Sequence, residues 1–294
     1  MKTRTIAAPL ALAALLAGTV ACGGTAEAGS AQHPAAGYQA NKLTITTNGM
    51  GYTIKGSPRP GNIDITFDNP DGAAHEAEIV KLADGKTIQD VLHDMQQGGE
   101  EAAAADLDGN PEEMNYGTPA MLSGGEKTEV VSGKLAPGTY GVVCFLPGPD
   151  GMPHVAMGMA AQFTVAGKEI DRTPKSAGTV QLADDGITLP DGFGSGTYEV
   201  TNTGTTPHSF SLARLDGSLD DLFAYIGGQF AQNEPIDGGP GALVGGVNTL
   251  LPGQTAYLVV DLQPGHYGYV STVQGDDPSD SDYARGLHGE FPIG

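Results

Sequence analysis

Positive charge is scarce in this sequence of 294 residues. Lysine and arginine together number 14, against 35 aspartates and glutamates, which gives a formal net charge of −21. A nucleic-acid-binding protein needs a basic face to contact phosphates, so this class is excluded. The same deficit argues against docking on anionic lipid through protein charge.

Tryptophan is absent, cysteine occurs only twice, and apolar residues reach only 39% of the chain. That share supports a hydrophobic core but not a bundle of membrane helices. Glycine and proline are numerous, at 45 and 20 residues, yet they stay below the share that is typical of disordered chains. The composition therefore favours short strands joined by many turns.

The N-terminus has the features of an export signal. Lys2 and Arg4 precede an apolar run of fifteen residues, Ile6–Val20, which is shorter than the roughly 20 residues needed to cross a bilayer. The run leads into Thr-Val-Ala-Cys, which resembles a bacterial lipobox and implies that Cys22 carries lipid. The alternative is cleavage near Ala26-Glu27-Ala28 and release as a secreted protein.

On the lipoprotein reading, the protein is exported and held on the outer side of the cell membrane through its N-terminal lipid alone. The small and polar residues up to position 40 would then form a flexible tether. Cys144 would be the only free thiol, so no disulfide could form within the chain. An exported thiol is open to oxidation, which leaves core packing or metal ligation as its role.

Two halves of the chain repeat the same order of motifs. Asn69 and His75 are six residues apart, as are Asn202 and His208. Each histidine is followed by an alternating segment and then by a capping box, Thr87-x-x-Asp90 or Ser218-x-x-Asp221, that predicts a helix. Further on, Leu-Ala-Pro-Gly-Thr-Tyr-Gly at 135–141 matches Leu-Gln-Pro-Gly-His-Tyr-Gly at 262–268. We therefore expect two domains of the same fold.

Alternating apolar residues predict strands in the first half, and turn signals such as Asn48-Gly49 and Pro137-Gly138 separate them. An acidic stretch at 98–117 is expected to be a solvated loop. The pattern predicts an all-β fold of two tandem Greek-key β-sandwich domains, each with a short helix insert. The expected strands of the first half are Leu43–Thr47, Ile63–Asn69, His75–Leu82, Thr128–Val131 and Tyr140–Phe145.

Four side chains of the first half suit a mononuclear copper site. The order is His75, then Cys144, nine residues, His154, four residues and Met159. Two imidazoles, a thiolate and a weak thioether make a trigonal site with a long axial bond, which serves electron transfer. Met157 competes with Met159 for the axial position, and the place of Met159 at the start of a strand favours it.

These residues resemble the cupredoxins, or type 1 blue copper proteins. The spacing of His154 and Met159 is similar to that of plastocyanins, and the long loop from Cys144 is similar to that of copper nitrite reductases, which also have two cupredoxin domains. The resemblance implies one type 1 copper held by His75, Cys144, His154 and Met159. It also implies that the exposed edge of His154, with Met152 and Met157 nearby, is the port for electrons.

The sequence departs from the enzymes of this group. Copper nitrite reductases place ligands of a second copper just before the cysteine and five residues after the first histidine, where Val143 and Val80 stand here. The His-x-His pairs of multicopper oxidases are also absent. These departures argue against both groups of enzymes, and we expect a non-enzymatic role. Small cupredoxins often follow the first ligand with an asparagine that braces the loops, whereas Glu76 stands here.

The second half has lost the metal ligands. Ser271 replaces Cys144, the position of His154 falls near Asp282, and Leu287 replaces Met159, so only His208 remains. The predicted regions are a signal peptide at 1–21, a lipidated N-terminus and tether at 22–40, a copper-binding domain at 41–167, a linker at 168–176 and a degenerate domain at 177–294.

The sequence thus predicts an extracytoplasmic electron carrier that cycles between Cu(I) and Cu(II). Its acidic surface would steer a basic redox partner. A copper-buffering or copper-delivery lipoprotein is one alternative, which Met152 and Met157 favour. A metal-free β-sandwich interaction module is the other. The sequence names neither the redox partner nor the oligomeric state.

Overall fold

The computed structural model describes residues 41–109, 114–148, 151–170, 172–274 and 280–294. The expected signal peptide, the lipidation site Cys22 and the tether lie outside these residues. No helix in the described part of the chain is long and apolar enough to cross a membrane.

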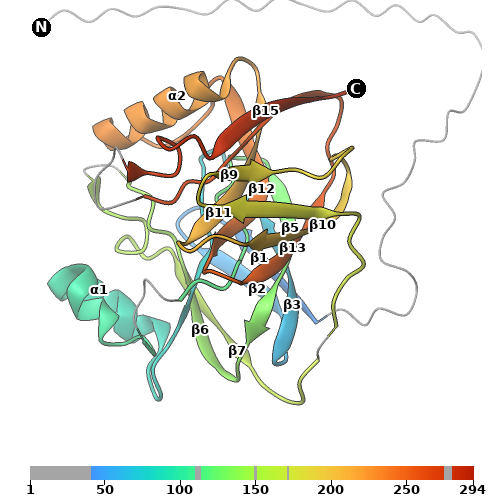
Figure 1. Ribbon diagram of the computed structural model, residues 1–294. Helices are drawn as coiled ribbons and strands as arrows, with labels where there is room; N and C mark the ends of the chain where they lie inside the picture. Colours follow the sequence, from blue (N-terminus) through green and yellow to red (C-terminus); the bar gives the residue numbers. More distant parts are fainter. Residues whose placement is uncertain (1–40, 110–113, 149–150, 171, 275–279) are drawn as a thin grey trace, which may run out of the picture. The chain divides into compact units, whose positions relative to one another are not determined.

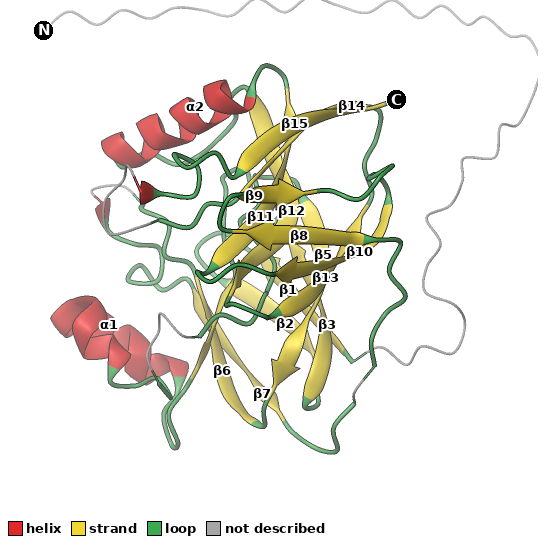
Figure 2. Cartoon of the chain, in the orientation of Figure 1, coloured by secondary structure: helices red, strands yellow, loops and turns green. Residues whose placement is uncertain are grey.

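Strands dominate the described residues, and one helix is inserted in each half of the chain (Figures 1 and 2). The first half contains β1 (Lys42–Thr47), β2 (Tyr52–Gly56), β3 (Gly61–Asp68), β4 (Glu78–Lys81), α1 (Ile88–Ala104), β5 (Lys127–Leu135), β6 (Gly138–Val143) and β7 (Ala160–Val165). The second half contains β8 (Thr179–Ala183), β9 (Gly186–Thr188), β10 (Gly196–Asn202), β11 (His208–Leu215), α2 (Leu219–Gln232), β12 (Gly241–Leu250), β13 (Thr255–Val260), β14 (Gly265–Val270) and β15 (His288–Ile293).

Each half is a two-sheet sandwich with the same strand pairing. One sheet of the first half has the order β2-β1-β3-β5, and the other has the order β4-β6-β7. Their counterparts are β9-β8-β10-β13 and β11-β14-β15, with β12 added beside β11. Because the chain crosses between sheets after β3, β4 and β5, the connections are of the Greek-key kind. The predicted all-β, tandem cupredoxin-like fold class is confirmed.

One sheet continues from one half into the other, and backbone hydrogen bonds join the halves at a second place. β5 and β13 pair antiparallel, with Val130 opposite Leu258, so eight strands form one sheet. The segment before β5 also pairs with β12, where Ala120 donates its backbone N–H to the oxygen of Gly246 and Ser123 donates to Leu243. The two sandwiches are therefore not separate units, and residues 41–294 lie within one compact unit.

The helices begin where the sequence predicts. The side chains of Thr87 and Ser218 cap α1 and α2, and both capping boxes are formed. The prediction of a loop at 98–117 is wrong for its first residues. α1 continues through a kink at Gly99, where φ is 73°, and ends at Ala104. Asp106, in the same stretch, is fully buried rather than solvated.

The predicted strand at His75–Leu82 is also too long. β4 begins only at Glu78, and His75 instead forms an isolated bridge with Leu122. The two residues exchange both backbone hydrogen bonds, at 3.0 and 2.9 Å. The first expected ligand is therefore fixed by the segment that also pairs with the second half.

Candidate metal centre

The strand register brings Cys144 and Met159 to the same end of one sheet. β6 and β7 pair antiparallel, with Val143 opposite Ala160. Cys144 directly follows Val143, and Met159 directly precedes Ala160. Both side chains are fully buried and belong to one hydrophobic cluster.

The loop between these strands folds back on itself and carries His154 inward. Val155 donates its backbone N–H to the oxygen of Cys144 at 2.8 Å, and His154 donates to that of Leu146 at 3.0 Å. Met159 donates in turn to the oxygen of His154 at 2.9 Å. His154 is therefore held between the cysteine and the methionine by backbone hydrogen bonds.

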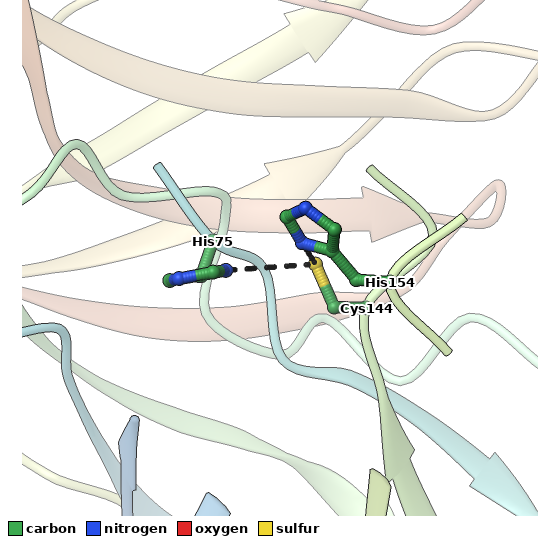
Figure 3. A group of neighbouring side chains, drawn as sticks. All are labelled: His75, Cys144 and His154. Carbon is green, nitrogen blue, oxygen red and sulfur yellow. Dashed lines mark hydrogen bonds between the residues drawn. The ribbon is translucent and has the colours of Figure 1, made fainter. Parts of the chain in front are cut away.

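Three of the predicted ligands converge on one point (Figure 3). Sγ of Cys144 lies 3.4 Å from Nδ1 of His154 and 4.0 Å from Nδ1 of His75. The ligand atoms of all three residues lie within 4.8 Å of one another. The residues are at most 4% exposed. Among the described residues, this is the group of histidine, cysteine and carboxylate side chains with the geometry to hold a metal ion.

Burial sets the protonation of the three groups. It lowers the pKa of His75 to about 4, with a further contribution from His154, and the nearby Asp71 opposes the shift. Burial also lowers the pKa of His154. It raises the pKa of the Cys144 thiol to about 12, and the charge of Glu76 adds to this effect. At neutral pH the site thus holds two neutral imidazoles, as metal binding requires, and a thiol whose proton a metal must displace.

Several groups around the ligands fix or polarise them. Hydrogen bonds from the backbones of Glu76 and Leu146 and from the side chain of Tyr52 lower the pKa of the Cys144 thiol, although burial outweighs them. Glu76 also accepts the backbone N–H of Phe145 at 2.6 Å. This carboxylate therefore braces the loop that carries the cysteine, at the position where small cupredoxins have asparagine.

Asp71 lies behind His75, with its Oδ2 atom 3.7 Å from the outer nitrogen Nε2. The same oxygen accepts the backbone N–H of Gly49 at 2.9 Å, which holds the carboxylate in place. A carboxylate at the outer nitrogen is a common partner of a metal-binding histidine, because it orients the ring. Sequence reasoning missed both Asp71 and Tyr52. The i, i+4 spacing of Asp71 and His75 was the available signal for the first.

The thiol and the two imidazoles are better suited to binding copper than to a purely structural role. Thiolate and imidazole ligands suit copper, and Nδ1 of each histidine faces the sulfur atom. Met159 is buried in the same cluster as Cys144, whereas Met157 is 39% exposed, so Met159 is the better placed of the two candidate methionines. The expectation that the edge of His154 is exposed is wrong, since this residue is only 4% exposed.

The second half holds a hydrogen-bonded cluster at the matching position. Leu287 donates its backbone N–H to the oxygen of Asp282 at 2.9 Å, which repeats the bond from Met159 to His154. Asp282 therefore replaces His154, as the sequence comparison predicts. Nδ1 of His208 lies 2.7 Å from Asp282 and Nε2 lies 3.0 Å from Asp184. Both ring nitrogens are occupied by carboxylates, so His208 has no free nitrogen for a metal.

Comparison with solved structures gives distant matches. No protein-family model matches the sequence, and no curated protein matches it. Among solved structures, reduced auracyanin from Roseiflexus castenholzii is 20% identical, with a TM-score of 0.26, over 40% of this chain and 95% of its own. A multicopper oxidase is 14% identical, with a TM-score of 0.23, over 86% and 88% of the two chains. The copper nitrite reductase from Nitrosomonas europaea is 10% identical, with a TM-score of 0.25, over 86% and 93%. At similarity this low, the residues of the site itself decide what it can bind.

Proposed function

We propose that the protein is an extracytoplasmic type 1 copper protein that carries single electrons. The observation that supports this most directly is the buried convergence of His75 Nδ1, Cys144 Sγ and His154 Nδ1. Copper, when bound, supplies the Cu(I)/Cu(II) couple. The copper site belongs to the region predicted at 41–167, and the region at 177–294 carries none of its ligands.

The surroundings of the site suit rapid electron transfer. The ligands come from a paired strand end and from loops fixed by backbone hydrogen bonds, so little rearrangement is expected when the charge changes. The hydrophobic cluster that contains Cys144 and Met159 also contains Leu215, Leu222 and Ile236 of the second half. Water is thereby kept from the thiolate, and a dry shell of this kind tunes the potential of a metal site.

A non-enzymatic role is part of this proposal. Val143 and Val80, at the positions where copper nitrite reductases have further ligands, are buried in an apolar cluster with residues of α1. Neither side chain can bind a metal. The expected partner is a basic redox protein, because the chain has a net charge of −21 and opposite charge speeds encounter.

The visible spectrum tests the copper site. Cu(II) is added to the protein with Cys22→Ser, so that Cys144 is its only thiol, and to the same protein with Cys144→Ser. We expect one copper per chain and an intense thiolate-to-copper band that Cys144→Ser removes. A colourless protein that binds no stoichiometric Cu(II) would overturn the electron-transfer proposal and leave Cu(I) binding, then the metal-free module, to be tested.

A second function, copper buffering or delivery, is supported by two sulfur side chains at the surface. Met152 and Met157 are 51% and 39% exposed, and both lie on the ligand loop. Exposed thioethers are soft ligands that could pass Cu(I) to an acceptor. Rapid loss of copper to a Cu(I) chelator, slowed by Met152→Leu with Met157→Leu, would favour delivery. A reversible potential with retained copper would favour electron transfer.

We also propose that the mature protein is anchored to the outer face of the cell membrane through lipid on Cys22. The lipobox-like residues 19–22 support this. Mass spectrometry of the N-terminal peptide from the native host tests it, with Cys22→Ala as the control. A mature chain that begins at another residue and carries no lipid would show that the protein is secreted.

A further inference from the structure

A small cavity lies beside His154, at the contact between the two halves. Its volume is about 10 Å³, which is room for about one water molecule. The ligand loop lines one side with His154 and Pro147, and the chain that follows α2 lines the other side with Glu234, Pro235 and Ile236. Residues of the second half thus lie close to His154, which is only 4% exposed.

This covering segment, residues 233–236, is held from both sides. The backbone oxygen of Ile236 accepts the N–H of Ala74, next to His75, at 2.8 Å. The oxygen of Pro235 accepts a hydrogen bond from the side chain of Gln229, on α2, at 2.8 Å. The side chain of Ile236 is buried in the cluster that contains Cys144 and Met159. The segment is therefore anchored both to the loop before His75 and to its own helix.

The ligand loop is shaped to receive the covering segment. Gly151 has a φ of 74°, and a Cβ atom placed there would lie 3.1 Å from Oδ1 of Asn233. Asn233 ends α2 in the left-handed conformation, with φ 55° and ψ 40°, and this turn directs the chain back over the loop. Only a residue without a side chain fits this approach easily.

We propose that the second half determines which reactants reach the copper site, with residues 233–236 closing the edge of His154. The carboxylate of Glu234, which is exposed beside the cavity, would disfavour anionic reactants and favour cationic ones. This inference rests on the proposed copper function and gives the second half a role, although it lacks the ligands. One electron passes to Cu(II) from a reductant outside the cover, and no bond is made or broken.

The first test reverses the charge at the cover. Glu234→Lys is compared with Asp185→Lys. Asp185 is an exposed residue in the turn between β8 and β9, and these strands form the edge of the eight-stranded sheet opposite to β1 and β2. The copper-loaded proteins are mixed with an anionic and a cationic one-electron reagent, hexacyanoferrate(II) and hexaammineruthenium(II). We expect Glu234→Lys to raise the ratio of the anionic to the cationic rate constant about tenfold, and Asp185→Lys to change it less than twofold.

The second test opens the cover. Ile236→Ala removes a buried side chain from the covering segment, and Ile226→Ala removes the same side chain from α2 within the same cluster. Both variants lose packing, but only the first uncovers His154. We expect Ile236→Ala to raise the rate constants for both reagents several-fold and Ile226→Ala to leave them unchanged.

The outcomes separate the two proposals. If the wild-type protein never develops the thiolate-to-copper band, the copper function itself fails. If the band is present and Glu234→Lys changes the two rates no more than Asp185→Lys does, the proposed cover is wrong. Glu234 is an exposed side chain, so this result does not depend on the folding of the Ile236 variant.

Discussion

Asn69 and Asn202 make two equivalent side-chain hydrogen bonds in the two halves of the chain. The side-chain amide of each donates to the backbone oxygen four residues later, at 2.9 Å from Asn69 to Ala73 and 2.8 Å from Asn202 to Thr206. Each also donates to a backbone oxygen in the part of the chain after the helix, that of Leu122 or that of Leu250. In both halves the amide therefore fixes the loop that leads to the buried histidine.

Replacing each asparagine with alanine distinguishes an effect on stability from an effect on copper binding. Asn69→Ala and Asn202→Ala should each reduce the free energy of unfolding by about 1–3 kcal/mol, because buried carbonyls lose their donor. Only Asn69→Ala should weaken copper binding, by about tenfold, because it frees the loop before His75. Competition with a copper chelator and urea unfolding measure the two effects. Equal copper affinity in the two variants would contradict the positioning role.

The hydroxyl of Tyr52 should tune the potential of the site. This hydroxyl donates to the backbone oxygen of Glu76, and the Tyr52 side chain also lowers the pKa of the Cys144 thiol. It thereby stabilises negative charge on the sulfur, which favours the electron-rich reduced state. Tyr52→Phe should therefore lower the reduction potential measured by voltammetry. Tyr140→Phe is the matched control, since its hydroxyl donates to the backbone of Ala136 at 3.0 Å. A potential that moves equally in both variants would show that Tyr52 has no special effect.

The axial ligand can be identified by exchanging the two candidate methionines. Met159→Gln replaces the thioether with a harder oxygen donor, which stabilises Cu(II), so the potential should fall and the visible band should shift. Met157→Gln should leave both unchanged, because Met157 is 39% exposed. Met159→Leu checks that loss of the buried side chain does not itself remove the band. The reverse pattern would make Met157 the ligand.

His208 should stabilise the protein in a pH-dependent way. Burial alone would lower its pKa, but hydrogen bonds to Asp282 and Asp184 and their charges outweigh this, so the pKa is raised. The stability from the protonated ring is then complete below its unfolded pKa of about 6.5 and is lost as the pH rises through the folded pKa. His208→Gln should cost about 3–5 kcal/mol at pH 6 and less at pH 9.

Urea unfolding of the copper-free protein at the two pH values measures this difference. His266→Gln is the control, because His266 forms an exposed ion pair with Glu290 at 3.1 Å, and such a pair is worth less than about 1 kcal/mol. Arg285, which binds Asp282, is unchanged in both variants. The same loss of stability at pH 6 and pH 9 would show that the charge on His208 is not involved.

The repeat and the ligand spacing predicted much of the fold and of the candidate site. The matching of Asp282 with His154 could be predicted because two copies of one strand-loop-strand unit can be compared within the chain. Tyr52 could not, because its contacts with Glu76 and Cys144 join residues far apart in sequence, and the edge strand β2 that carries it has no fully buried residue. The covering segment at 233–236 could not be predicted either, since its contacts with Ala74 and His154 join residues far apart in sequence. The continuation of α1 through Gly98 and Gly99 was hidden by residues that normally end helices.

The pairing of β5 with β13 has a consequence for any attempt to divide the protein. If the chain were cut in the predicted linker at 168–176, β5 or β13 would become an edge strand of its fragment. A second edge would open near residues 118–123 in one fragment and at β12 in the other. Such edges pair readily with other strands. The two fragments are therefore expected to aggregate when made separately and to reassemble when made together. In that setting the copper band would be a visible signal of complementation between the pieces.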